Sequence, residues 1–305
     1  SILRSPRRPT LALPQYLVEG MTTLSEWQSS GIRITVQGLN IFTRVIGNGP
    51  PILILHGFPT SSYDYSRIIP PLSEHYQLIL FDYPGFGLSD KPNLEIYSIH
   101  KYAEVAQYLV DYLGLHRVKI LAHDIGDSVA LELLGNNPNM IENIVLLNGS
   151  IISTPFEDYQ MLLAQRLLLT HQITKFLNRL RFINKLFFMA MMRKAFFKEL
   201  PPDEFNTFWK LFCVNQGDTI YYHLIQYMPE RREFEKKWLE YLKTHSAPLT
   251  MIWGQDDPIA PPSITSDILK IRPNSTSIIL ENTAHYPHWE SPQKTISGIL
   301  QAFKG

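Results

Sequence analysis

Short, mainly apolar runs alternate with longer amphipathic stretches along most of the chain. The apolar runs occupy residues 51–55, 78–81, 118–122, 144–147, 249–253 and 277–280. Such runs are typical of strands that are buried on both faces, as in a parallel sheet. Apolar residues recur at helical spacing within residues 98–113, 128–134, 262–271 and 293–303. Because strands alternate with helices, we expect βαβ units and an α/β fold with a doubly wound, mostly parallel sheet.

The pattern differs before residue 51 and again in the middle of the chain. The pattern predicts two further strands at residues 32–36 and 40–46, joined by a turn at Gln37-Gly38. Between 151 and 246 the spacing is helical and rich in aromatic residues. We therefore expect a core formed by 31–150 and 247–305, with 151–246 as a helical cap over the carboxyl edge of the sheet. Residues 1–30 are expected to form a tail that leads into a short docking helix.

Composition narrows the range of functions. Lys and Arg number 28, and so do Asp and Glu, so no overall field attracts nucleic acid. The one cysteine, Cys213, excludes a disulfide framework and a cysteine-based metal site. No apolar run approaches the ~20 residues of a membrane-spanning helix, and no motif for a nucleotide, a flavin or a metal occurs. We expect a cytoplasmic, monomeric protein that needs no cofactor and binds a small molecule.

The most informative segment is residues 119–130, where a strand is followed almost at once by a helix. Asp124 stands on this tight turn, which is the position of the nucleophile in a strand–turn–helix elbow. A carboxylate is already ionised, so it can attack carbon directly and form an ester that water then hydrolyses. The backbone N–H groups of Phe58 and Ile125 are the expected donors to the oxyanion. The alternative is that Asp124 only caps the following helix.

A general base and an orienting acid are expected on later loops. His285 follows the last predicted strand and completes the chain order nucleophile, acid, base. His288 is its competitor, expected to line the surface or to lie behind the groups that touch substrate. Asp257 is the expected acid and Asp256 the alternative, although an Asp-Pro pair also occurs in ordinary turns.

Together, these segments resemble the α/β-hydrolase family. The matching segments are His56–Ser61, Asp82–Asp90, His123–Gly126, Gly254–Pro258, and His285 with Glu290–Pro292. The aspartate at the elbow resembles that of epoxide hydrolases and haloalkane dehalogenases. Segments 27–31, 56–64, 89–92, 97–99 and 123–127 are most similar to mesoderm-specific-transcript-like hydrolases and the β-lactone decarboxylases. That group often has an aromatic residue where Ile125 stands.

The resemblance leaves several substrate classes open. Haloalkane dehalogenases hold the departing halide with tryptophan or asparagine, whereas the side chains of Ile125 and Phe58 donate no hydrogen bond. Dehalogenation is therefore the less favoured alternative. Epoxide hydrolases need lid tyrosines that donate to the opening ring, and the candidates are Tyr159, Tyr221, Tyr222 and Tyr227. Opening of a β-lactone needs the same triad without a tyrosine pair. A non-catalytic ligand-binding protein and a cofactor-free oxygenase are the rival functions.

The expected cap also carries a pattern of its own. Its leucines, phenylalanines and methionines favour an apolar substrate. Within 179–198, six Lys and Arg residues are interleaved with five phenylalanines, and no acid occurs. This combination predicts peripheral contact with an anionic membrane surface.

Overall fold

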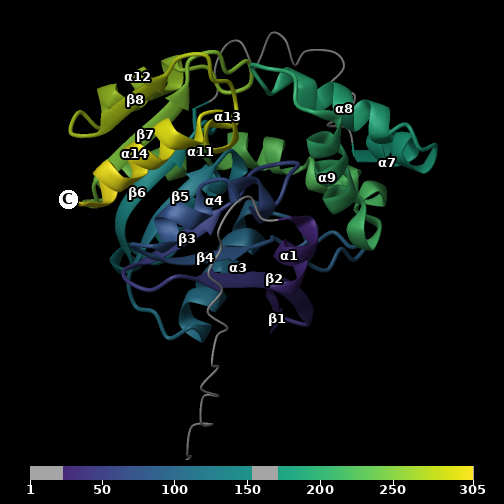
Figure 1. Ribbon diagram of the computed structural model, residues 1–305, viewed down its shortest axis with the longest axis horizontal. Coiled ribbons are helices and arrows are strands. Elements are labelled where there is room, and N and C mark those ends of the chain that lie inside the picture. The colour runs from purple at the N-terminus through teal and green to yellow at the C-terminus, as the bar shows by residue number, and fades with distance from the viewer. Residues whose placement is uncertain (1–22, 153–170, 305) are drawn as a thin grey trace, which may run out of the picture.

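An eight-stranded sheet forms the centre of the protein (Figure 1). The computed structural model describes residues 23–152 and 171–304. The strands are β1 (Ile32–Val36), β2 (Leu39–Ile46), β3 (Pro51–Leu55), β4 (Gln77–Phe81), β5 (Val118–His123), β6 (Ile141–Leu147), β7 (Leu249–Gly254) and β8 (Thr276–Leu280). Their order is β1-β2-β4-β3-β5-β6-β7-β8, and all pairs from β4 to β8 are parallel. The predicted doubly wound, mostly parallel sheet is confirmed.

Helices pack on both faces of the sheet. In the core they are α1 (Leu24–Ser29), α2 (Ile69–Ser73), α3 (Ile99–Tyr112), α4 (Ile125–Asn136), α12 (Ser263–Ile271), α13 (Pro287–Glu290) and α14 (Pro292–Lys304). Helices α3 and α4 pack against each other, and α4 contacts β3, β5 and β6. Helices α2 and α14 pack together and contact β4, β6 and β7. Short 3₁₀ turns occupy Ser62–Tyr65, Pro138–Met140 and Val214–Thr219.

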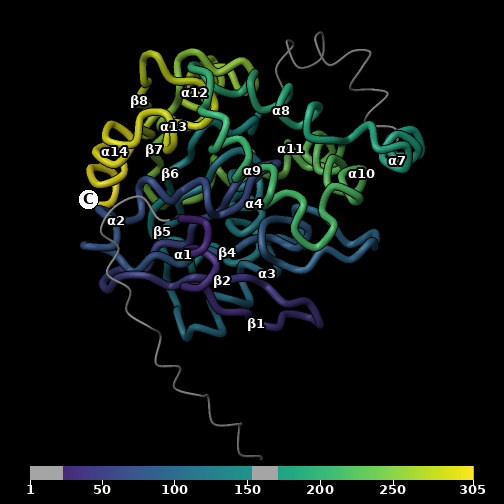
Figure 2. The backbone as a smooth tube through the Cα atoms, turned by 45° about the vertical axis from the view of Figure 1, so that its right-hand side comes forward, coloured from purple at the N-terminus to yellow at the C-terminus, as the bar shows by residue number. Residues whose placement is uncertain are grey.

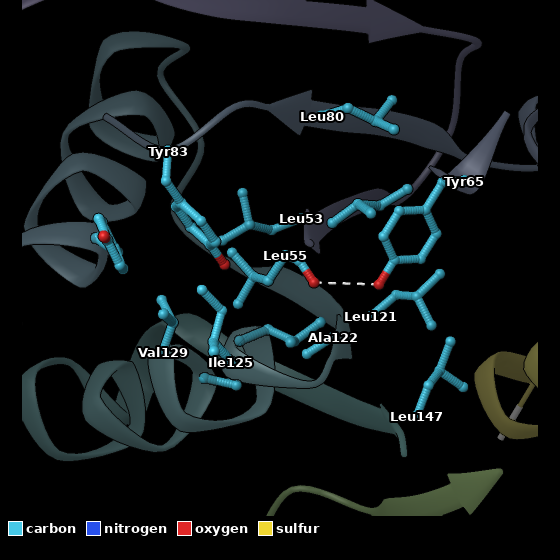
Figure 3. Close-up of a cluster of buried hydrophobic side chains, with 14 of the residues drawn as sticks. Leu53, Leu55, Tyr65, Leu80, Tyr83, Leu121, Ala122, Ile125, Val129 and Leu147 are labelled. Atoms are coloured by element: carbon cyan, nitrogen blue, oxygen red, sulfur yellow. Dashed lines mark hydrogen bonds between the residues drawn. The ribbon is translucent and has the colours of Figure 1, made fainter. Parts of the chain in front are cut away.

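The central strands are buried because both of their faces carry apolar side chains. Leu53 and Leu55 of β3 are wholly inaccessible to solvent. They lie in a cluster with Leu121 and Ile125 (Figure 3). The hydroxyl of Tyr65 donates to the carbonyl of Leu55 at 3.1 Å, so this ring satisfies its polar atom inside the apolar layer. The register of the sheet is thus fixed on both faces, which holds the strand ends in place.

The strand order reverses at β3. The next strand in the chain, β4, lies on one side of β3, and β5 lies on the other. Open α/β sheets bind ligands at the carboxyl ends of the strands beside such a reversal. At the far edge, β8 pairs only with β7, and Ile279 of β8 is 42% exposed.

Five helices between β6 and β7 form the helical insertion, residues 171–244 of the described chain. They are α7 (His171–Arg179), α8 (Lys185–Lys194), α9 (Pro202–Cys213), α10 (Tyr221–Leu224) and α11 (Tyr227–Thr244). Helix α11 packs on α4, whereas α7 and α8 lie at the periphery of the molecule (Figures 1 and 2). Among the described residues, no helix is both long enough and apolar enough to cross a bilayer.

Candidate active site

Asp124 lies on a strained turn between β5 and α4. Its φ is 52° and its ψ is −111°, a backbone conformation that L-residues rarely adopt. Helix α4 begins at the next residue, Ile125, earlier than the sequence pattern indicated. The Asp124 side chain makes no helix-capping hydrogen bond. The interpretation of Asp124 as a simple cap is therefore wrong, and the turn instead presents its carboxylate at the carboxyl edge of the sheet.

Two glycines allow the backbone to pack closely around this turn. A Cβ at Gly126 would lie 2.3 Å from the backbone oxygen of Leu55. A Cβ at Gly57 would lie 2.9 Å from the Cβ of Asp124. Any side chain at either position would force backbone segments apart. The loop after β3 can therefore approach the carboxylate only because both positions lack a side chain.

Two backbone N–H groups contact the carboxylate of Asp124. Phe58 N–H donates to Asp124 Oδ2 at 2.8 Å, and Ile125 N–H also hydrogen-bonds the carboxylate. Burial raises the pKa of Asp124, while the charges of His285 and Arg231 and these N–H groups oppose the rise. The structure thus brings the N–H groups of Phe58 and Ile125 to the carboxylate of Asp124.

His285 lies beside the other carboxylate oxygen. Its Nε2 is 4.0 Å from Asp124 Oδ1, and its Nδ1 is 2.8 Å from Asp257 Oδ2. Burial lowers the pKa of His285, but the negative charges of Asp257 and Asp124 outweigh burial and raise the pKa above its ordinary value. The three side chains are almost fully buried. Asp256 is exposed, so the structure brings Asp257 and not Asp256 to the imidazole.

Four donors surround the Asp257 carboxylate. Oδ1 accepts from the backbone N–H groups of Ile259 at 2.7 Å and Ala260 at 3.1 Å. Oδ2 accepts from Asn148 Nδ2 at 2.7 Å, in addition to its contact with His285. Hydrogen bonds at both oxygens fix the orientation of a carboxylate. The orientation of His285 therefore depends on donors from two different loops.

Sequence reasoning did not identify Asn148. It follows β6, has a φ of 44°, and is fully buried. Its Nδ2 also donates to the carbonyl of Ala284 at 3.2 Å, and its Oδ1 accepts from Gly254 N–H at 3.0 Å. Asn148 therefore joins the loops after β6, β7 and β8. Its place directly after a buried strand was the available signal.

Glu290 fixes the loop that carries the base. Its carboxylate accepts from the backbone N–H groups of Ala284 at 3.0 Å and Phe197 at 2.7 Å. The N–H of His285 donates to the carbonyl of Ala195 at 3.0 Å. The base loop is thereby joined to the segment between α8 and α9 of the helical insertion.

A second buried polar cluster lies behind the candidate site. Ligand atoms of Asp64, His123 and His288 all lie within 4.8 Å of one another, and the side chains are fully buried. His288 Nε2 is 3.5 Å from Asp64 Oδ1, and His123 Nε2 contacts the carbonyl of His285 at 2.7 Å. Two imidazoles and one carboxylate are a donor set that could hold a divalent cation. Of the two positions expected for His288, the surface is wrong, because the side chain is fully buried and stacks on Tyr65; it lies instead behind the candidate site.

The candidate tyrosines lie in different surroundings. The rings of Tyr221 and Tyr227 lie 5.8 Å and 5.3 Å from that of Phe58, beside the expected oxyanion site. Burial raises the pKa of Tyr221 far above its ordinary value, so its hydroxyl keeps its proton. Tyr222 instead donates to Asn93 at 2.6 Å. Tyr159 lies outside the described residues.

Asn93 connects Tyr222 to a separate polar cavity. Its side-chain oxygen also contacts Nε2 of His223 at 3.0 Å. His223 lines a cavity of about 250 Å³ together with Glu95, Tyr97, His171 and Gln226. The contacts of Tyr222 thus belong to this cavity, whose lining contains no member of the Asp124–His285 pair.

Comparisons with known proteins identify the family. Residues 50–292 match the family model described as alpha/beta hydrolase fold. The chain is 35% identical to the mesoderm-specific transcript protein of Mus musculus, over 92% of this chain and 87% of that protein. It is 31% identical to the putative hydrolase LipZ of Mycobacterium tuberculosis, over 91% and 97% respectively.

A solved structure agrees with this assignment. An alpha/beta hydrolase fold protein from Burkholderia ambifaria superimposes with a TM-score of 0.76 at 21% identity, over 88% of this chain and 96% of that one. At this identity the likeness shows the fold alone. Taken with the family match, it places the chain in the α/β-hydrolase fold family, among relatives that are named as hydrolases.

Proposed function

We propose that this α/β hydrolase opens an apolar electrophile through a covalent ester at Asp124, which water activated by His285 then hydrolyses. The observation that carries the proposal is that the two carboxylate oxygens of Asp124 have different neighbours. Oδ2 accepts from Phe58 N–H at 2.8 Å, while Oδ1 lies 4.0 Å from His285 Nε2. Oδ1 is therefore the nucleophile, and Oδ2 becomes the ester carbonyl oxygen.

Hydrolysis of the ester follows from the same geometry. His285 Nε2 removes a proton from water, and the water oxygen attacks the carbonyl carbon of the ester. The negative charge that develops on Oδ2 is stabilised by the N–H groups of Phe58 and Ile125. The ester C–O bond then breaks, and the proton on His285 passes to the departing alkoxide. One carboxylate oxygen of Asp124 now originates from water.

An epoxide is the substrate class that the neighbouring tyrosines favour. Attack on an epoxide carbon breaks the ring C–O bond and leaves negative charge on the ring oxygen, which requires a proton donor. Tyr221 and Tyr227 border Phe58 and supply candidate donors from the helical insertion. Haloalkanes are disfavoured because the Ile125 and Phe58 side chains offer a halide no N–H donor.

Labelled water tests the mechanism. Turnover in H₂¹⁸O should place the label in Asp124, detected by mass spectrometry of the active-site peptide. In His285→Gln the ester should persist, and the intact protein should gain the mass of the substrate. Asp124→Asn is the matched control and should gain neither label nor substrate mass. Label that appears only in the product, with no adduct in His285→Gln, would exclude the ester.

The products distinguish the substrate classes. A diol from an epoxide supports epoxide hydrolysis, whereas an alkene and carbon dioxide from a β-lactone support β-lactone opening. If no epoxide, β-lactone or haloalkane reacts, but Asp124→Ala retains tight binding of an apolar ligand, the protein is a binding protein on a hydrolase fold.

A further inference from the structure

Helices α7 and α8 and the turns beside them carry both exposed apolar and exposed basic side chains. The described residues contain ten exposed large hydrophobic side chains, and five of them lie in this one segment: Phe176, Leu180, Phe182, Leu186 and Phe197. We call this surface, residues 175–198, the basic–apolar face. Exposed apolar side chains that are scattered singly need no explanation, but a cluster of this kind marks an interaction site.

Charge is distributed unequally between this segment and the rest of the chain. Residues 171–199 contain seven of the 28 Lys and Arg residues and one of the 28 Asp and Glu residues. Their formal charge is therefore +6, and that of the remaining residues is −6. All seven basic side chains are exposed. The acid, Glu199, is 3.2 Å from Arg193 in an exposed pair, which leaves most of the positive charge open to a partner.

The folding of α8 explains why its apolar residues divide between two faces. Phe188 and Met192 are buried, and the Phe188 ring lies 5.4 Å from Trp209 of α9. Leu186, by contrast, is 77% exposed, and Arg193 and Lys194 are exposed on the same helix. The inner residues therefore account for the packing of α8 on α9, and the outer residues are not needed for it.

We infer that the basic–apolar face binds the surface of an anionic phospholipid bilayer. The charge complements acidic headgroups, and the exposed Phe and Leu side chains reach the acyl boundary between them. A nucleic acid would be attracted by the charge but would gain little from Leu180 and Leu186. The position of α7 and α8 at the periphery lets a flat surface reach them (Figures 1 and 2).

Vesicle flotation with the full chain tests this inference. The protein should float with vesicles of phosphatidylcholine and phosphatidylserine, and much less with phosphatidylcholine alone. Binding should weaken strongly at about 1 M salt, where the Debye length falls to about 3 Å. Each basic residue near an anionic surface contributes about fivefold to binding, so Arg179→Gln, Arg181→Gln and Lys185→Gln together should weaken binding about 100-fold.

Two matched controls keep the result specific. Lys236→Gln, Lys243→Gln and Lys270→Gln remove the same charge elsewhere and should leave binding within about twofold if the face is responsible. Phe182→Ser with Leu186→Ser should weaken binding about tenfold or more, whereas Leu94→Ser with Ile259→Ser, also exposed, should not. Circular dichroism and melting temperature should be unchanged in all four variants.

Three outcomes would overturn the inference. These are failure to float with anionic vesicles, equal binding to neutral and anionic vesicles, and equal loss of binding in the control variants. Sedimentation velocity provides a further check. If the wild-type protein dimerises and Phe182→Ser with Leu186→Ser abolishes the dimer, the face belongs to a second copy of the chain.

Discussion

Asp257→Asn should separate ester formation from ester hydrolysis. The carboxylate accepts from two donors at each oxygen, at 2.7 to 3.1 Å, whereas an amide has one acceptor oxygen and one NH₂ group. Whichever way the amide turns, its NH₂ group faces two donors. Two charge-assisted hydrogen bonds, each worth about 1.5–3 kcal/mol, are lost. Removal of a buried charge offsets part of this loss, so we expect a decrease of about 2–4 kcal/mol in the free energy of unfolding.

The kinetic effect should be confined to the second step. His285 without its carboxylate partner loses both its orientation and the stabilisation of its charged form, which costs about 10³–10⁴-fold in related triads. Attack by Asp124 requires no base and should change little. Rapid quenching followed by intact-protein mass spectrometry should therefore show the ester accumulating, and urea unfolding should show the stability loss. Asp256→Asn, one residue away and exposed, is the control.

The reasoning fails if the two steps slow equally, or if Asp256→Asn has the same effect. Equal slowing would mean that Asp257 supports the whole site and not the base alone. An unchanged free energy of unfolding would mean that the four hydrogen bonds do not hold the carboxylate as described.

Three other perturbations have defined outcomes. Ester formation removes the negative charge of Asp124, which is one of the charges that raise the pKa of His285. The pKa of His285 should therefore be lower in the ester than in the free enzyme, and the rate of ester hydrolysis should fall only at this lower pH. Single-turnover kinetics measure the pKa in the ester, and NMR titration measures it in the free enzyme. Gly126→Ala places a Cβ 2.3 Å from a backbone oxygen and should destabilise by about 1–3 kcal/mol or more in thermal unfolding. Lys91→Met removes a buried ammonium group that donates to three backbone carbonyls around the end of α9, and should lower the free energy of unfolding in urea by about 2–4 kcal/mol. Lys101→Met is the control and should leave the free energy of unfolding nearly unchanged, because Lys101 donates to no backbone carbonyl of α9.

The sequence pattern predicted the sheet well because its central strands are buried on both faces. An apolar run such as 51–55 has few alternatives to a buried strand, and β3 occupies the same residues. The order of Asp124, Asp257 and His285 was also predictable, because each follows a recognisable strand. The start of α4 was placed too late, since a one-residue turn with positive φ leaves no sequence gap between strand and helix.

Residues that act through long-range contacts could not be predicted in this way. Asn148 is a lone polar residue after a strand, and its three partners lie more than one hundred residues away in the chain. The sequence left open whether His288 lies at the surface or behind the site, because its partner Asp64 comes from the distant loop after β3. The division between Tyr221 and Tyr222 depends on the direction of a single turn, α10, which sequence spacing does not specify.

The placement of β8 at the edge of the sheet has a consequence for how the protein loses its activity. Strand β8 leads directly to His285, while β5, which carries Asp124, lies between two neighbours. Edge elements open more easily than central ones. Local unfolding of β8 would move the imidazole away while the Asp124 carboxylate stayed in place. Mild denaturation would then leave molecules that form the proposed ester but cannot hydrolyse it.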